Sequence, residues 1–401
     1  MAKMAEDIVA VGAARTPFGS FGGTLRDVVV WDLGATAIRA ALERAGISGD
    51  VVDQVIFANC RQAGNGANPA RTAAVRGGVT IKAPMFTINM ACPSSMKSLM
   101  LASREIACGA AKIVVAGGME SMSTMPYLLK NARWQGFKTG DRTLLDSWND
   151  TAVDPLCGMS VGLQTEVQAT KYNISRAEQD EFALQSQLKA AKARAEGLTA
   201  SEIVPFKLPA TKKSPEGELF TQDEAIRDDA NAAALARLKP VFKADGGTVT
   251  AGNATPMGDG ACAVVLTTRA NAKALGLKPM FSIVSFADTG CDPAMMGEGP
   301  SYSIPLALAQ AGMKISDVDF IEVNEAFAAQ VIANERVLGW DRAKLNVYGG
   351  SLALTHPTGV SGARLLVTLE NILRRQNKEI GLASICGGGG VTTAMVIRRE
   401  S

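Results

Sequence analysis

The sequence predicts an α/β protein made of two similar halves, with an extra lobe inserted between them. At 401 residues, the chain is too long for one ordinary hydrophobic core. Strand-like and helix-like segments alternate towards both ends, which predicts mostly parallel sheets covered by helices. Residues 41–57 also align without gaps on residues 307–323, with six identical positions. Chance similarity is the alternative to an internal duplication, and the duplication is favoured.

Composition and charge exclude several classes of protein. Hydrophobic residues make up 47% of the chain and charged residues 20%, which is typical of a folded globular protein. A net charge of +2 provides no strong field for nucleic acid or an acidic membrane. No apolar run is long enough to span a bilayer, and residues 1–7 lack the core of a signal peptide. We therefore expect a cytoplasmic protein with neither nucleic acid nor membrane as a partner.

The cysteines and the histidine bear on redox state and metal binding. Seven cysteines form no Cys-x-x-Cys pair, and their odd number suits reduced thiols. A single histidine, His356, makes a transition-metal site improbable. We therefore expect no bound metal.

The first half contains regularly spaced strand and helix signals. The predicted elements are a buried strand at 8–11, a helix at 32–45 that ends at Gly46, and a strand at 51–57. A short apolar strand from residue 86 then leads through a tight turn into a helix with Pro93 at its first position. The strand at 112–118 closes this unit.

Composition changes over residues 122–251, which predicts the inserted lobe. This stretch is rich in charges and poor in strand-like runs. Helices are predicted at 176–195 and 223–238, with an exposed loop at 211–217. Residues 250–266 return to the core through a glycine turn and a buried strand, and a helix after His356 leads to a strand within 380–390.

Cys92 is the first candidate catalytic residue. The predicted helix leaves it at the N-cap, where unpaired N–H groups and the helix dipole favour an anion. A thiol in that position should lose its proton more readily and act as a nucleophile. The alternative is a small buried core cysteine.

Three late segments supply possible partners for Cys92. Asn324 and Glu325 follow a strand, although a turn-capping asparagine with a solvated glutamate would look the same. His356 lies between glycine turns, and Cys386 is followed by four glycines. Such a set suits carbon–carbon cleavage or formation beside a thioester, with Cys92 as nucleophile, His356 as its base and Cys386 as a second acid/base. Asn324 and His356 would together hold an enolate oxygen through a water. The backbone N–H groups of Cys92 and Gly388 would donate hydrogen bonds to a tetrahedral oxyanion.

These motifs, taken together and in order, resemble those of the thiolase family over essentially the whole chain. The matching segments are 14–19, 62–64, 68–71, 89–95, 117–123, 250–259, 324–327, 349–362 and 386–390. The resemblance implies two stacked βαβαβαββ halves with buried helices between them, in a homodimer or homotetramer. It divides the chain into an N-terminal half at 1–121 with 252–272, a loop domain covering coenzyme A at 122–251, and a C-terminal half at 273–401.

The resemblance also assigns roles by position. It matches the catalytic set to Cys92, His356, Cys386, Asn324 and Gly388. Coenzyme A is implied as a co-substrate, not a permanently bound cofactor, and its contacts match Arg227, Phe242, Ala251, Thr255, Ala326 and Phe327. The implied activity is thiolytic cleavage of 3-ketoacyl-CoA or the reverse Claisen condensation, within fatty acid metabolism.

Several positions depart from the family pattern. The departures are Thr355 before the histidine, Thr392 after the last glycine run, Ser160, Ala234 and the segment 255–258. Because these lie around the pocket, acyl-chain length is left open. Two other functions are alternatives: a non-catalytic acyl-CoA-binding subunit, which the altered pocket favours, and a decarboxylating ketoacyl synthase, which the second cysteine disfavours.

Overall fold

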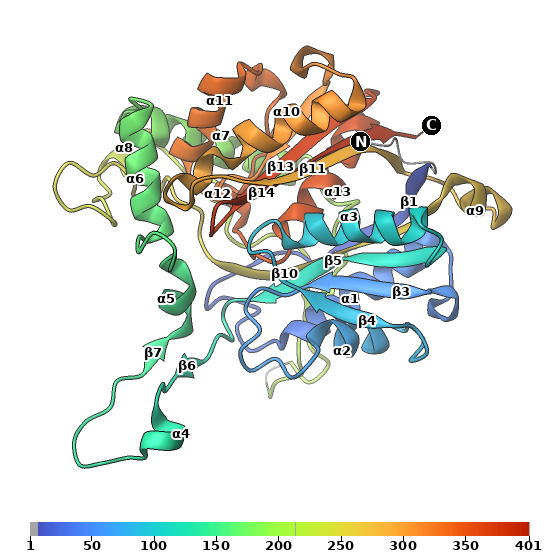
Figure 1. Cartoon of the computed structure of the whole chain (residues 1–401), viewed down its shortest axis with the longest axis horizontal. Helices are drawn as coiled ribbons and strands as arrows, with labels where there is room; N and C mark the ends of the chain where they lie inside the picture. Colours follow the sequence, from blue (N-terminus) through green and yellow to red (C-terminus); the bar gives the residue numbers. More distant parts are fainter. Residues whose placement is uncertain (1–6, 213, 401) are drawn as a thin grey trace.

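A ten-stranded sheet runs through the molecule and joins the two halves of the chain (Figure 1). The computed structural model describes residues 7–212 and 214–400. Strands follow the order β12-β13-β14-β11-β1-β10-β5-β3-β4, with β2 paired to β10. The first part of the chain contains β1 (Ile8–Arg15), β2 (Gly19–Ser20), α1 (Val30–Ala45), η1 (Gly49–Val51), β3 (Gln54–Ala58), α2 (Pro69–Arg76), β4 (Met85–Ile88), α3 (Ser94–Ala107) and β5 (Ile113–Ser121).

The later part of the chain repeats this alternation of strands and helices. It contains β10 (Gly258–Thr268), α9 (Arg269–Ala274), β11 (Phe281–Gly290), η2 (Pro293–Glu298), α10 (Gly299–Ala311), η3 (Ile315–Asp317), β12 (Phe320–Val323), α11 (Ala328–Leu338), η4 (Arg342–Lys344), α12 (Ser351–Leu354), α13 (Ser361–Arg375), β13 (Ile380–Gly387) and β14 (Val391–Arg399).

The sheet is mixed, so the prediction of mostly parallel strands is wrong. Among the strand pairs of the described residues, only β3–β4, β3–β5 and β12–β13 are parallel. The pairs β1–β10, β1–β11, β5–β10, β11–β14 and β13–β14 are antiparallel. The glycine turn between β13 and β14 is too short for the crossover that parallel neighbours need. The strands predicted at 8–11 and within 250–266 form as β1 and β10 but pair antiparallel, and the central strands β11 and β14 were not predicted.

Matching local details in the two halves confirm the predicted duplication. Helix α1 ends at Gly46 with φ 70° and ψ 28°, and α10 ends at Gly312 with φ 69° and ψ 28°. The Asp53 carboxylate then accepts hydrogen bonds from two successive backbone N–H groups at the start of β5. Asp319 likewise accepts hydrogen bonds from two successive backbone N–H groups, at the start of β13.

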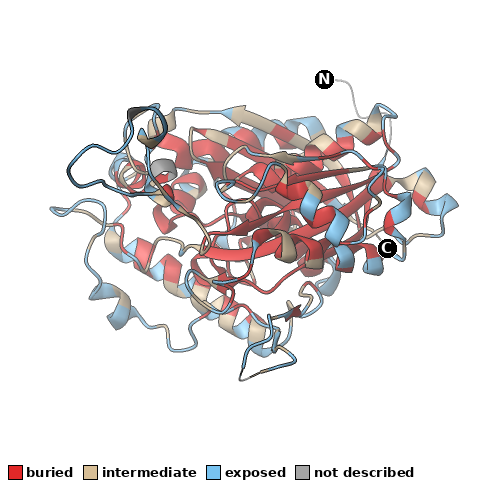
Figure 2. Cartoon of the chain, turned by 90° about the horizontal axis from the view of Figure 1, so that it is seen from below, coloured by how far each residue is buried: buried red, intermediate tan, exposed pale blue. Residues whose placement is uncertain are grey.

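Two buried helices, α3 and α13, pack against each other at the centre of the molecule. Every residue of α13 from Ser361 to Leu373 is buried, and Figure 2 shows the extent of this core. Gly362 permits the close contact, because a Cβ atom there would lie 2.7 Å from the backbone nitrogen of Met96. The two helices thereby fix the segments that precede them, which carry Cys92 and His356.

Residues 122–251 contain short elements and one long helix. They form β6 (Tyr127–Leu128), α4 (Ala132–Gln135), β7 (Leu145–Asp146), α5 (Ser147–Ala152), α6 (Val161–Lys171), α7 (Arg176–Ala195), β8 (Phe206–Lys207), β9 (Leu219–Phe220) and α8 (Ala232–Ala236). Figure 1 shows β6, α4 and β7 in an arm that projects from the body. Helix α7 matches the prediction, and Ser175 and Glu178 form a capping box at its start.

The predicted helix at 223–238 is wrong, because only α8 forms there. Asp223 is buried and accepts hydrogen bonds from both Nη atoms of Arg15, at 2.7 and 2.9 Å. It also accepts one from the backbone N–H of Phe18. This buried ionic contact holds residue 223 in a non-helical conformation despite the alanine-rich sequence that follows. Across the described ranges, no helix combines the length and apolar character needed to cross a bilayer.

Candidate active site

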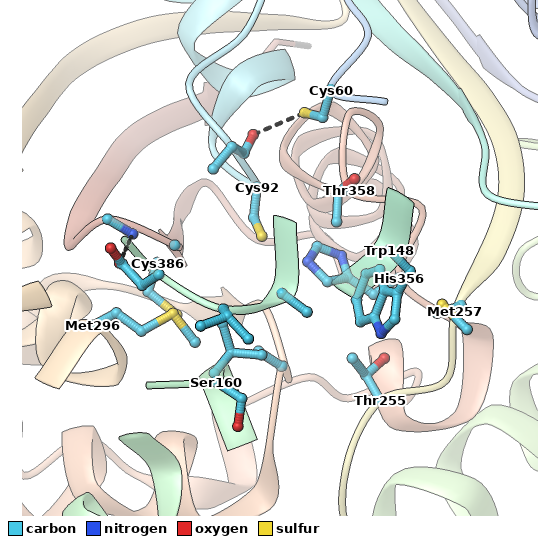
Figure 3. A pocket seen from close by; sticks show the side chains of 18 of the residues that line it. Cys60, Cys92, Trp148, Ser160, Thr255, Met257, Met296, His356, Thr358 and Cys386 are labelled. Atoms are coloured by element: carbon cyan, nitrogen blue, oxygen red, sulfur yellow. Dashed lines mark hydrogen bonds between the residues drawn. The ribbon is translucent and has the colours of Figure 1, made fainter. Parts of the chain in front are cut away.

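A cavity of about 520 Å³ brings together residues from both halves and from the middle segment. Cys92, His356, Cys386 and Gly388, four of the five predicted catalytic residues, line it. In Figure 3 the side chains of Cys92 and His356 lie side by side at this cavity. Within the part of the chain that the structure describes, no cluster of three or more His, Cys, Asp or Glu side chains is arranged to hold a metal.

Cys92 lies in a strained turn between β4 and α3. Helix α3 begins at Ser94 with Pro93 as its N-cap, so the predictions of Cys92 at the N-cap and Pro93 inside the helix are wrong by one residue. Ala91 has φ 53°, a left-handed conformation that is uncommon for alanine. Its carbonyl oxygen accepts hydrogen bonds from Ser94 Oγ at 2.5 Å and Cys60 Sγ at 3.1 Å. These bonds stabilise the turn that presents the Cys92 sulfur to the cavity.

The prediction of a low pKa for Cys92 is also wrong. Burial raises the pKa of the Cys92 thiol above its ordinary value. The positive charge of Arg61 and the backbone N–H of Gly388 act in the opposite direction and only partly offset burial. Cys92 is therefore a thiol in the resting site and needs a base to become a nucleophile.

His356 has the right protonation state to be that base. Its Nδ1 lies 2.6 Å from Ser361 Oγ, which in turn donates to the Pro357 carbonyl oxygen at 3.3 Å. This chain of bonds makes Nδ1 the donor and leaves the lone pair on Nε2. Nε2 is buried and has no hydrogen-bond partner among the described residues. Burial, with the charges of Arg364 and Arg61, lowers the pKa of His356 to about 3.

We expect His356 to remain neutral in a ¹⁵N NMR titration of the imidazole from pH 8 down to pH 5. A lowered pKa means that the ring stays deprotonated as the pH falls past its ordinary value of about 6.5. Because His356 is the chain's single histidine, its signals need no assignment. A midpoint near pH 6.5 in the folded protein would contradict this account. Protein unfolded in urea serves as the control and should titrate near that value.

Cys386 lies at the end of β13, where the sheet meets the cavity. Burial, followed by the nearby Cys92 sulfur, raises the pKa of Cys386 well above its ordinary value. The group is therefore a proton donor in the resting site. After it, Gly389 and Gly390 adopt φ values of 83° and 73°, which favour glycine. The Gly389 N–H donates to Asp154 at 2.7 Å, while a side chain at Gly388 would meet nothing within 4 Å.

Asn324 is held beside the site without lining the cavity. It is fully buried, and its Oδ1 accepts a hydrogen bond from Ser351 Oγ at 2.7 Å. Ser351 accepts from Arg364, which forms a buried ion pair with Glu322. This chain orients the amide so that Nδ2 is the free donor, and Nδ2 has no partner within residues 7–212 and 214–400.

Glu325 is not the solvated glutamate of the alternative interpretation. It is 1% exposed, and its carboxylate accepts hydrogen bonds from Ser186, Asn346 and the backbone of Leu352. Burial raises its pKa. The carboxylate therefore connects the segment after β12 to α7 and α12, and supports the neighbouring Asn324.

The predicted coenzyme A residues divide into two groups. Phe242, Thr255, Ala326 and Phe327 line the cavity, whereas Arg227 and Ala251 are exposed and do not. The rings of Phe242 and Phe327 meet edge to face with centroids 6.2 Å apart. The Thr255 N–H donates to the Ala326 carbonyl at 3.0 Å, which joins the two segments into one wall.

Glu120 is an anchoring residue to which sequence reasoning gave no role. Its buried carboxylate accepts hydrogen bonds from Asn59, from the N–H groups of Cys60 and Arg61, and from Thr358 and the Gly359 N–H, at 2.5–3.1 Å. These bonds join the loop after β3 to the loop that carries His356. Glu120 lies within the segment 117–123 that matches the family. A single glutamate at the end of a strand does not indicate which donors its carboxylate will bind.

Two departures from the family pattern contact each other. Thr355, in place of the usual glycine, has φ 84° and a buried Oγ1 without a partner among the described residues. Its side chain occupies the space next to Gly258, where a Cβ atom would lie 2.2 Å from Thr355 Oγ1. The altered segment 255–258 thus accommodates the altered residue 355.

We expect Thr355→Gly to raise the free energy of unfolding by about 1 kcal/mol. Relief of backbone strain worth roughly 1–3 kcal/mol exceeds the entropy cost of about 0.5–1 kcal/mol for a new glycine. Urea denaturation measures the change. As a matched test, Gly258→Ala should destabilise the wild type more than it destabilises Thr355→Gly. A loss of stability in Thr355→Gly would contradict the inferred strain.

Comparisons with known proteins agree with this geometry. Residues 8–270 match the model of the thiolase N-terminal domain, and residues 277–399 match that of the thiolase C-terminal domain. An acetyl-CoA acetyltransferase of Chromobacterium violaceum is 44% identical over 98% of this chain and all of its own. The crystal structure of a Bacillus anthracis acetyl-CoA acetyltransferase has a TM-score of 0.95 at 39% identity, covering 98% of this chain and 99% of that one.

Human mitochondrial 3-ketoacyl-CoA thiolase in complex with CoA is a further structural relative. It has a TM-score of 0.94 and 38% identity, and the match covers 99% of each chain. Fold, cavity and sequence agree over nearly the full length of the protein. The chain belongs to the thiolase family.

Proposed function

We propose that this thiolase cleaves 3-oxoacyl-CoA with coenzyme A, and runs the reverse Claisen condensation, through an acyl group carried on Cys92. As a thiolase, the chain is an acyltransferase. The observation that carries the proposal is the meeting of Cys92, His356 and Cys386 in one cavity, with the Gly388 N–H close enough to Cys92 to lower its pKa. The relatives named above are enzymes, so they give no support to a non-catalytic subunit.

In the first half of cleavage, the Cys92 proton passes to His356 Nε2 and the thiolate attacks the C3 carbonyl carbon. The backbone N–H groups of Cys92 and Gly388 are the proposed donors to the tetrahedral oxyanion. When the C2–C3 bond breaks, its electron pair moves to C2 as the enolate of acetyl-CoA. Cys386 donates its proton to C2, while Asn324 with His356 would hold the enolate oxygen through a water.

In the second half, coenzyme A removes the acyl group from Cys92. Its thiol proton passes to the Cys386 thiolate, and the resulting sulfur attacks the acyl carbon. Acyl-CoA leaves, and Cys92 regains its proton from the His356 imidazolium. Both cysteines and the histidine return to their resting states, so the cycle needs no metal and no redox partner.

The solved CoA complex of a relative supports coenzyme A as the second substrate. We place its pantetheine arm along the wall formed by Phe242, Thr255, Ala326 and Phe327. Arg227 and Ala251, exposed in this structure, are proposed contacts nearer the surface. Residues 122–251 would form the loop domain over coenzyme A, between the halves 1–121 with 252–272 and 273–401. We also propose that the protein forms a homodimer or homotetramer, that it lies in the cytoplasm, and that it acts in fatty acid metabolism.

The test is an assay of the purified protein with acetoacetyl-CoA and longer 3-oxoacyl-CoA thioesters. Each is incubated with coenzyme A, and loss of the enolate absorbance is followed. We expect turnover of at least one chain length that depends on coenzyme A. Absence of turnover at every length, in protein that still binds coenzyme A, would favour the non-catalytic alternative.

A further inference from the structure

Asp154 connects the middle segment of the chain to the glycine turn between β13 and β14. It lines the cavity and is 5% exposed. One carboxylate oxygen, Oδ2, accepts a hydrogen bond from the Gly389 N–H at 2.7 Å. The other oxygen, Oδ1, accepts a hydrogen bond from the Leu156 N–H at 2.8 Å. Asp154 takes no part in the proposed proton transfers or in the proposed pantetheine wall.

The middle segment holds Asp154 in a fixed position. The Asp154 N–H donates to the Met159 carbonyl oxygen at 3.0 Å, and the Gly158 N–H donates to the Asp154 carbonyl oxygen at 2.7 Å. Val153 and Ser160 pair antiparallel on either side of this closed turn. The Ser160 side chain also caps the start of α6. The carboxylate is therefore presented to the cavity from a well-supported turn.

The glycine turn at 387–390 has no side chains with which to fix its own conformation. At one end, Gly387 lies against Pro93, because a Cβ atom there would be 2.5 Å from the Pro93 Cδ. At the other end, the Gly390 carbonyl oxygen accepts a hydrogen bond from the Cys291 N–H at 2.7 Å. The hydrogen bond to the carboxylate described above holds the middle of the turn.

This hydrogen bond fixes the residue that follows a proposed oxyanion donor. The Gly388 N–H is close enough to Cys92 to lower the pKa of its thiol. Gly388 lies between Gly387, which packs beside Cys92, and Gly389, whose N–H is held. A glycine between two fixed neighbours loses the freedom to turn its N–H away from the sulfur. Oxyanion donors are effective when they already point at the oxygen that becomes charged.

The carboxylate serves this purpose through the position of its two oxygens and not through its charge. A negative charge beside the cavity does not favour an oxyanion. Two acceptor oxygens are required, because the N–H groups of Leu156 and Gly389 approach different oxygens. An asparagine at residue 154 would offer one acceptor oxygen and one donor group, so it could satisfy one of these N–H groups but not both.

We infer that Asp154 is a positioning residue that holds the Gly388 N–H where the tetrahedral oxyanion forms. Asp154 then supports the formation and breakdown of the acyl-cysteine. Removal of an α-proton from acetyl-CoA does not depend on it, because the enolate oxygen is assigned to Asn324 and His356. This inference rests on the proposed function and adds a residue to it.

The test measures two exchange reactions of acetyl-CoA in Asp154→Ala. Exchange of labelled coenzyme A into acetyl-CoA passes through the oxyanion and should slow by roughly 10–100-fold, somewhat less than the loss of a whole oxyanion donor would cost. Exchange of the α-protons with D₂O is measured after excess acetyl-CoA has acylated Cys92, so that it does not wait for acylation. It should stay close to the wild-type rate. Asp154→Asn should give an intermediate loss of coenzyme A exchange.

Asp341→Ala is the matched control. Asp341 is exposed, lies outside the cavity and accepts a hydrogen bond from the Ala343 N–H at 2.9 Å, so both rates should be unchanged in this variant. The ratio of the two rates within each variant cancels any loss of folded enzyme. Asp154→Asn, which keeps one acceptor oxygen, carries the test if the alanine variant does not fold.

The outcomes separate this inference from the proposed function. Equal losses of both exchange reactions in the Asp154 variants, or unchanged coenzyme A exchange, would overturn the inference and leave the thiolase function in place. A wild type that catalyses neither exchange and cleaves no 3-oxoacyl-CoA would overturn the proposed function itself.

Discussion

Replacing Cys92 with serine is expected to lower kcat for cleavage of 3-oxoacyl-CoA by roughly 10⁴–10⁶-fold, the loss typical of removing a covalent nucleophile. Serine keeps the size of the side chain but has a far higher pKa than a thiol. The neutral His356, whose pKa is lowered to about 3, is too weak a base to ionise an alcohol. The measurement is loss of enolate absorbance in the presence of coenzyme A.

Two controls accompany this variant. Coenzyme A binding, followed by calorimetry, should persist in Cys92→Ser, because the sulfur is not part of the pantetheine wall. Cys108→Ser changes an exposed cysteine outside the cavity and should retain full activity. Retention of more than a few per cent of wild-type kcat by Cys92→Ser would show that another group carries the acyl chain.

Replacing Cys386 with alanine is expected to separate the two halves of the reaction. Loss of an acid/base group should slow exchange of the α-protons of acetyl-CoA with D₂O by roughly 10²–10⁴-fold. Acylation of Cys92 by acetyl-CoA forms no carbanion, so in this exchange Cys386 carries only the proton of the coenzyme A thiol, which is far more acidic than the α-carbon of acetyl-CoA. Exchange of labelled coenzyme A into acetyl-CoA should therefore fall much less. NMR of the acetyl protons and scintillation counting of the thioester measure the two rates.

Cys291→Ala is the matched control for this second prediction. Cys291 lies near Cys386 but does not line the cavity, and burial raises the pKa of its thiol to about 11. Both exchange rates should be unchanged in this variant. Equal losses of proton exchange and coenzyme A exchange in Cys386→Ala would mean that Cys386 supports the geometry of the site and does not transfer the proton.

The sequence predicted those features that local chemistry determines. A glycine after an apolar helical pattern located the end of α1, and the gapless match of residues 41–57 to 307–323 indicated the duplication that the structure confirms. The order of short motifs identified the family, and eight of the eleven site residues carried over from it line the cavity. Each of these signals lies within a few residues of the feature it predicts.

Features that depend on distant contacts were missed. The antiparallel centre of the sheet arises from strands that fold back across the molecule, and the buried contact between Asp223 and Arg15 prevents the helix predicted at 223–238. The pKa of Cys92 was assigned the wrong direction because burial outweighs the favourable N–H groups. Arg61 meets Trp148 only in the folded chain, and its neighbours in sequence give no sign of this contact.

The departures at Thr355 and Gly258 illustrate the same limit. Read one at a time, a threonine in place of glycine and an altered 255–258 segment both suggested a changed pocket. In the structure they are one adjustment, because the smaller residue 258 makes room for the larger residue 355. The catalytic set beside them is intact.

The central claim is that the acyl group is carried by the sulfur of Cys92. Incubation of the enzyme with acetyl-CoA, followed by acid quenching, proteolysis and mass spectrometry, tests it directly. We predict one acetyl group on the peptide that contains Cys92, absent from Cys92→Ser and removed by added coenzyme A. An acetyl group on the Cys386 peptide instead, or none on any peptide of an enzyme that turns over, would contradict the account.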